Sequence, residues 1–166
     1  GHAIQVNHHN YIVPLNMQFD NQEEFIQGLY KIGNLFNEIN NSKSLQNIII
    51  LDACRTNPFE NHTIAEQNSM SQGLAPIKAP NNTLIAFATE PGGVAADGKQ
   101  KNGIYTKHLL QHIKKQISAE EVFKKVRQGV SKQTRNKQIP WEHSSLLNEV
   151  FISPPKNRDL PDFTVF

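Results

Sequence analysis

Cys54 is the residue of this chain best suited to act as a nucleophile. It is the chain's single cysteine, and it follows the apolar run 48–51 with only Asp52 and Ala53 between them. A continuous apolar run bounded by polar residues predicts a strand buried on both faces, as in a parallel sheet. Cys54 would then lie at the carboxyl end of that strand, where open α/β sheets place their active clefts. A lone cysteine at a strand end is otherwise most often a small buried hydrophobe.

His2 lies 52 positions before Cys54 and is the candidate base. A thiol is weakly nucleophilic until it is deprotonated, and a neighbouring imidazole can hold the proton and later deliver it to the leaving amine. One cysteine with a histidine elsewhere in the chain is therefore a candidate catalytic dyad. A Gly-His start can also be a cloning remnant, so the histidine needs support from the rest of the chain.

That support comes from five segments that occur in the order known from one family. The segment around Cys54 compares with the caspase signature Gln-Ala-Cys-Arg-Gly, whose histidine lies roughly 50 residues upstream. Asp52 stands where caspases have glutamine. The chain resembles the caspase-like cysteine peptidases, and in particular their metacaspase and paracaspase-like branch. The matching segments are 1–5 (GHAIQ), 51–59 (LDACRTNPF), 83–91 (TLIAFATEP), 102–110 (NGIYTKHLL) and 140–146 (PWEHSSL).

The resemblance implies an α/β fold, a caspase-like mostly parallel sheet with helices on both faces. In such domains the catalytic histidine follows the third of six strands, so a chain that opens at Gly1 is expected to lack the first three strands. We expect residues 1–153 to be the C-terminal part of a caspase-like peptidase domain and residues 154–166 to be an extended tail. The expected partner is the missing N-terminal half, in cis or as a separate chain, because an open apolar edge at 48–51 would promote aggregation.

The resemblance also implies a cysteine endopeptidase with a Cys-His dyad. The oxyanion of the tetrahedral intermediate needs backbone donors, which in the family are the N–H of the glycine after the histidine and that of the cysteine. Here the first donor belongs to Ala3, whose methyl group makes the oxyanion hole tighter. The alternative is a non-catalytic caspase-like module that binds peptides or partner proteins. Ala3 favours that alternative, whereas the intact Asp-Ala-Cys-Arg sequence and His2 argue against it.

Substrate selection is predicted to depend on acidic residues near the nucleophile. Asp52 precedes Cys54 by two residues, and strand alternation places both side chains on the same side. The resemblance implies that Asp52 lines the primary specificity pocket, with Asp97 from a later loop as the second acid and Glu90 as a weaker candidate. The implied cleavage is after Arg or Lys. The alternative roles are a capping or turn residue for Asp52 and a turn residue for Asp97.

The remaining candidates are one aromatic residue and a pair of histidines. Trp141 resembles the aromatic residue that borders the substrate groove in the family, although a lone tryptophan is equally often part of the core. His8 and His9 would point to opposite faces of a strand and are joined by no cysteine or acid cluster, so we interpret them as solvated turn residues. We expect no organic cofactor and no metal. Metacaspases often require calcium, but no cluster of acids that could bind it is visible.

Composition excludes several classes of protein. The 17 basic and 15 acidic residues give a net charge of +2 without a basic block, so no nucleic-acid partner is expected. No apolar stretch approaches the roughly 18 residues of a membrane span, and no secretory signal is visible. A single cysteine cannot form an internal disulfide, which fits a reducing compartment and a cytoplasmic protein.

Periodicity predicts the elements that position these residues. A hairpin is expected over 3–14, around the polar turn 7–10. Capping boxes and apolar spacing predict helices over 21–39, 103–115 and 118–132, the second burying Leu109, Leu110 and Ile113. Strands are predicted over 47–53, 83–89 and 148–153, and an irregular segment over 55–80.

Overall fold

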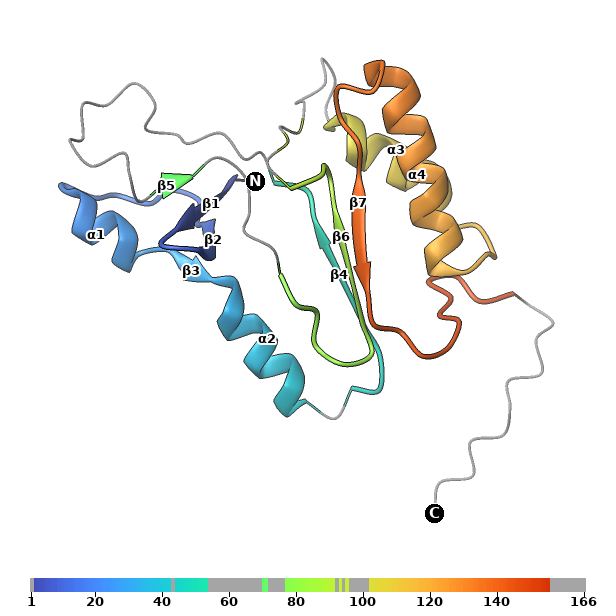
Figure 1. The fold of residues 1–166 in the computed structure, drawn as a ribbon, viewed down its shortest axis with the longest axis horizontal. Helices are drawn as coiled ribbons and strands as arrows, with labels where there is room; N and C mark the ends of the chain where they lie inside the picture. The colour runs from blue at the N-terminus through green and yellow to red at the C-terminus, as the bar shows by residue number, and fades with distance from the viewer. Residues whose placement is uncertain are drawn as a thin grey trace.

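The computed structural model describes residues 2–42, 44–53, 70–71, 77–91, 93, 95 and 102–155. They form a mixed α/β fold with two sheets (Figure 1). The four-stranded sheet has the order β3-β2-β1-β5 and the three-stranded sheet has the order β4-β6-β7. The described helices are α1 (Gln22–Gln27), α2 (Ile32–Asn41), α3 (Ile104–His112) and α4 (Ala119–Thr134). The described strands are β1 (His2–Val6), β2 (His9–Val13), β3 (Tyr30–Lys31), β4 (Asn47–Leu51), β5 (Met70–Ser71), β6 (Thr83–Phe87) and β7 (Trp141–Ser144).

Strand β6 is the centre of the fold, and all of its residues are buried. Its side chains alternate between the two faces of the sheet, as strand geometry requires. Leu84 and Ala86 join the apolar cluster formed with α3 and α4. Ile85 and Phe87 join a second cluster with Ala3 of β1 and parts of α2 and β4. The three-stranded sheet is therefore covered on both faces, as predicted (Figure 1).

Strand β4 confirms the predicted apolar strand but not its burial on both faces. It pairs in parallel with β6, in the register Asn47↔Thr83 to Leu51↔Phe87. Its side chains are only partly buried, and Ile50 is 36% exposed, because no other described strand pairs with its outer edge. A mostly parallel sheet is not confirmed, since β4 with β6 is the only parallel pair among the described strands.

The predicted hairpin is confirmed. Strands β1 and β2 pair antiparallel from His2↔Val13 to Val6↔His9. The two turn residues Asn7 and His8 have φ angles of 49° and 62°. Two consecutive positive φ angles are typical of the type I′ turn, whose twist matches that of the flanking strands. The chain reversal at this turn therefore has a local cause.

The single helix predicted over 21–39 is wrong, because the chain forms α1 and α2 with β3 between them. The N–H of Gly28 ends α1 by donating to Glu24 and Phe25 carbonyl groups, and a Cβ at Gly28 would lie 3.0 Å from the Met17 sulfur. Tyr30–Lys31 then pairs with β2. The helix also begins one residue later than predicted, because Asn21 rather than Asp20 accepts the capping hydrogen bond from the Glu24 N–H. Pairing with a strand distant in sequence therefore overrides the helical periodicity.

The C-terminal half confirms one helix and corrects two details. Ser118 caps α4, whose residues Val122, Phe123, Val126 and Val130 are fully buried as predicted. In α3 the buried residues are Tyr105 and Leu109, whereas Leu110 is 56% exposed and Ile113 is half-buried.

The last strand is not 148–153 but β7, which pairs antiparallel with β6. Strand β7 has the polar sequence WEHS and a largely exposed surface, because it forms the edge of the sheet. It is also tied to α4 through the ion pair between Arg127 and Glu142. Residues 148–153 instead run past the start of α4, where the Ala119 N–H donates to the Val150 carbonyl at 2.7 Å.

Candidate active site

Three segments of the chain meet at one edge of the three-stranded sheet. Leu51 at the end of β4 is in register with Phe87 at the end of β6, and Phe87 is in register with Trp141 at the start of β7. The Ala88 N–H donates to the Leu51 carbonyl at 3.1 Å, which holds the two chains together just beyond the strands. This carboxyl edge is where open α/β sheets bind their ligands.

Asp52 is the first residue after β4 and is held by α3. Its carboxylate oxygen Oδ2 accepts a hydrogen bond of 2.5 Å from the Thr106 hydroxyl. Helix α3 begins at Ile104 with no acidic residue in its first turn and no side-chain cap from Gly103. The positive end of a helix stabilises a nearby carboxylate, so the start of α3 suits the charge of Asp52.

Tyr105 lies beside this carboxylate in the core. Its side chain is buried, and its hydroxyl has no hydrogen-bond partner in the described part of the chain. Burial, and then the negative charge of Asp52, raise the pKa of Tyr105 well above its usual value. The ring is therefore neutral over the physiological pH range.

The neighbours of both predicted catalytic residues lie in the same apolar cluster. Ala3 is 2% exposed and packs with Phe87, and Ala53 packs against this cluster. His2 is exposed at the start of β1, and Figure 1 shows this end of the chain beside the end of β4. Cys54 itself lies outside the described residues, so the dyad and the oxyanion role of Ala3 stay predictions.

Asp52 and Ala53 extend beyond β4 toward opposite faces of the sheet. The carboxylate of Asp52 contacts α3, whereas Ala53 packs on the side of β1 and α2. Cys54 lies outside the described residues. The shared side predicted for Asp52 and Cys54 therefore stays a prediction.

The loop after β6 is fixed by Glu90. Its carboxylate oxygen Oε2 accepts hydrogen bonds from the Thr89 hydroxyl at 2.8 Å and from the Ile139 N–H at 3.0 Å. Gly93 lies so close to the Glu90 carboxylate and the Thr89 hydroxyl that an added Cβ would clash with both. Glu90 therefore stabilises this loop, and these hydrogen bonds compete with the alternative prediction that Glu90 binds a basic substrate residue. The stronger candidate, Asp97, lies outside the described residues.

Gln138 connects this loop to the segment before β7. Its side-chain amide is buried and donates to the Ala88 carbonyl at 2.8 Å. The sequence patterns single out neither Gln138 nor Thr106, because a lone glutamine in a connecting segment and a threonine in a helix carry no signal of a distant partner. Their roles follow from contacts across 50 and 54 positions of the chain.

Trp141 is 50% exposed. The alternative interpretation, in which Trp141 is part of the core, is therefore wrong. Its pairing with Phe87 places it on the face of the sheet that carries β1 and α2. A half-exposed indole at the candidate edge offers a flat apolar surface to a ligand. Its role in a substrate groove stays a prediction.

The structure places His8 and His9 as interpreted, with exposed side chains at the hairpin turn. Among the residues described, no group of three or more His, Cys, Asp or Glu side chains could hold a metal ion. None of the described helices is both long enough and apolar enough to span a membrane.

These observations define a mixed α/β domain with its candidate site at the carboxyl edge of a sheet. In the sequence, Cys54 follows the last residue of β4 by three positions. The family model of the caspase domain matches residues 1–152. The chain belongs to the caspase domain family, whose members are generally cysteine peptidases. A comparison with curated proteins finds no match.

Proposed function

We propose that this chain is a cysteine endopeptidase in which His2 and Cys54 form the catalytic dyad. One observation carries the proposal beyond the family assignment. Ala3 and Ala53, the chain neighbours of the two residues, belong to one apolar cluster at the candidate edge. Packing of these neighbours restrains the backbone on both sides of the site, which is a requirement for a base within about 3 Å of its proton.

The proposed reaction uses these residues as follows. The thiolate of Cys54 attacks the carbonyl carbon of the scissile peptide bond, and the oxyanion is stabilised by the N–H groups of Ala3 and Cys54. The protonated imidazole of His2 donates its proton to the leaving amine as the C–N bond breaks. Water, deprotonated by the same imidazole, then hydrolyses the thioester and regenerates the thiol.

Asp52 is proposed to select a basic residue of the substrate. A carboxylate that pairs with Arg or Lys replaces part of the lost hydration by a charge-assisted hydrogen bond. The hydrogen bond from Thr106 supports this role, because it holds the carboxylate at a defined position. Asp97 as a second acid and Trp141 as an aromatic wall complete the proposed primary site.

The outer edge of β4 is proposed to pair with a further strand of the same domain, supplied in cis or as a separate chain. The observation in favour is the partly exposed row Ile48 to Leu51, which has no strand partner among the described residues. An open apolar edge of this kind promotes aggregation unless another strand covers it.

The test uses the full-length protein and a peptidyl-arginine electrophile that labels an active thiol. Labelling is expected in the wild type and in the matched control His143→Ala, whose exposed histidine lies on β7. Cys54→Ala should abolish labelling and His2→Ala should reduce it strongly. Turnover of peptide substrates should fall by about 10⁶-fold in Cys54→Ala, by analogy with other covalent hydrolases.

Two results would contradict the proposal. Wild-type turnover in Cys54→Ala would show that Cys54 is not the nucleophile. Binding of the electrophile without covalent reaction would indicate a non-catalytic peptide-binding module. A peptide library that shows no basic preference would reject the role of Asp52 but leave Cys54 untouched. Circular dichroism spectra of the variants show whether lost activity reflects lost folding.

A further inference from the structure

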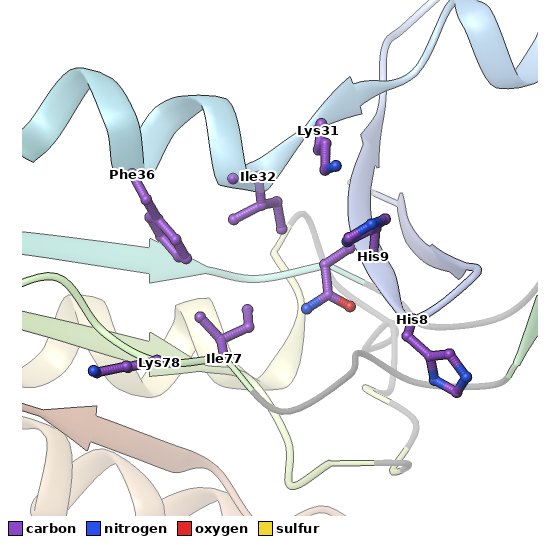
Figure 2. A pocket seen from close by; sticks show the side chains of 9 residues that line it. His8, His9, Lys31, Ile32, Phe36, Ile77 and Lys78 are labelled. Carbon is purple, nitrogen blue, oxygen red and sulfur yellow. The ribbon is translucent and has the colours of Figure 1, made fainter.

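A cavity of about 180 Å³ lies between the hairpin turn, the start of α2 and the segment before β6 (Figure 2). Its apolar walls are Ile32, Phe36 and Ile77, whose side chains surround one hollow in Figure 2. His9 and Lys31 belong to its polar rim. The cavity therefore combines an apolar floor with a basic border.

Among the described residues, two lysines and no acidic side chain line this cavity. Lys31 is half-buried and Lys78 is exposed, and neither forms an ion pair with any described residue. Helix α2 begins beside them with no acid in its first turn and no side-chain cap from Lys31. The first N–H groups of a helix carry partial positive charge and have no partner within the helix. Lys31, Lys78 and the first turn of α2 therefore all contribute positive potential to this cavity.

Gly33 in the first turn of α2 leaves the helix backbone accessible at this point. A Cβ added there would contact only the Lys31 side chain, at 3.8 Å. A larger residue at Gly33 can therefore be introduced without a clash, and it would extend into the space beside the cavity. This position offers a way to block the hollow while the helix remains intact.

We propose that this cavity binds an acidic peptide segment of a partner protein. A hydrophobic side chain of the peptide lies on Ile32, Phe36 and Ile77, and the next carboxylate lies near Lys31 and Lys78. The volume supports a side chain rather than a whole small molecule, because pockets for small molecules usually enclose about 300–1,000 Å³. The proposal goes beyond the proposed peptidase activity, because it requires neither Cys54 nor His2.

The cavity walls Phe36 and Ile77 pack in the same apolar cluster as Ala3 and Ala53, the chain neighbours of His2 and Cys54. A bound acidic segment would therefore contact the cluster that carries these neighbours.

The experiment measures binding of the fluorescein-labelled peptide Gly-Ser-Leu-Glu-Glu-Ser-Gly to the full-length protein by fluorescence anisotropy. This peptide contains no Arg or Lys, so the proposed cleavage does not interfere. We expect it to bind at least about tenfold more tightly than the same peptide with Gln in place of Glu. Lys31→Gln and Lys78→Gln should each weaken binding by about two- to fivefold, the range of partly exposed ion pairs. The matched control Lys124→Gln, on the exposed side of α4, should bind like the wild type.

The variant Gly33→Glu tests whether peptide binding can be lost while the fold remains stable. An acid in the first turn and the loss of a helical glycine both favour the helix, so the melting temperature should stay the same or rise. Affinity for the Glu peptide should nevertheless fall by about tenfold, because the new carboxylate occupies and neutralises the cavity. Equal affinity for the Glu and Gln peptides, or unchanged affinity in Gly33→Glu, would overturn the proposal, whatever the outcome of the labelling of Cys54.

Discussion

The hydroxyl of Thr106 donates a 2.5 Å hydrogen bond to the carboxylate of Asp52, and so joins the first turn of α3 to the residue directly after β4. The opposite side of this turn is anchored in the core, where Tyr105 and Leu109 pack against β6. The position of the predicted specificity acid therefore depends on how α3 packs on the sheet, although α3 supplies none of the predicted catalytic residues.

Removing this hydrogen bond should weaken selection of basic substrates. Thr106→Val keeps the shape of the side chain but leaves the carboxylate of Asp52 without this donor. Hydrogen bonds to charged groups typically contribute about 1.5–3 kcal/mol. We expect KM for a peptidyl-arginine substrate to rise by about five- to thirtyfold with a smaller change in kcat, and Thr106→Ser to restore it. An unchanged preference for arginine in Thr106→Val would show that Asp52 does not need this contact.

Tyr105→Phe is expected to be neutral or stabilising at neutral pH. The hydroxyl is buried without a partner in the described part of the chain, and removing an unsatisfied polar group can offset any loss of packing. Thermal unfolding at pH about 7 should therefore occur at the same or a higher temperature. A clear drop in melting temperature would mean that the hydroxyl has a stabilising partner.

The same variant should change the alkaline stability of the fold. Burial and the charge of Asp52 raise the pKa of Tyr105 above its unfolded value of 10.0. Below pH 10.0 the phenol is neutral in both the folded and the unfolded chain, so the raised pKa takes nothing from stability there. As the pH rises above 10.0 the unfolded chain ionises first, and the fold loses stability. Unfolding in urea between pH about 9 and about 11 should show less loss of stability in Tyr105→Phe than in the wild type. Identical slopes in the two proteins would contradict the raised pKa.

Gly129→Ala should destabilise the domain, although alanine is the better helix former by about 1 kcal/mol. Gly129 lies on α4 where His108 of α3 passes so closely that a Cβ would overlap the imidazole ring. The ring is held there by contact with Gln133 at 2.9 Å. We expect a loss of about 1–3 kcal/mol on overpacking, measured by urea unfolding.

The double variant provides the control for this contact. Truncation in His108→Ala makes room for the added methyl group, so the two substitutions together should cost less than the sum of the single ones. Additive losses would show that α3 and α4 do not meet at this pair.

Gln138→Leu should loosen the loop after β6. The substitution keeps the bulk of a fully buried side chain but leaves the Ala88 carbonyl without the amide donor. The expected cost is about 1–3 kcal/mol in urea unfolding, the typical penalty for a buried group left without its partner. The matched control Gln128→Leu, on the exposed face of α4, should change stability by less than about 0.5 kcal/mol. Equal effects at the two positions would contradict the structural role of Gln138.

The sequence alone determined the features that depend on short-range geometry. The reversal at Asn7 and His8, the buried face of α4 and the apolar strands β4 and β6 follow from turn preference, helical spacing and apolar runs. The family resemblance and the predicted nucleophile also came from linear motifs, and the caspase domain match confirms the family. Each local pattern, and each segment of the family motif, is complete within a few neighbouring residues, so no distant contact is needed to recognise it.

Only the tertiary structure decided the features that depend on partners far along the chain. Residues 30–31 leave the helical pattern because β2 offers them backbone hydrogen bonds, and the polar residues 141–144 become a strand because β6 does the same. The contact between Thr106 and Asp52 likewise requires α3 to pack across the end of β4. Backbone hydrogen bonds to another strand and packing against a helix are supplied by residues dozens of positions away, so no local pattern carries them.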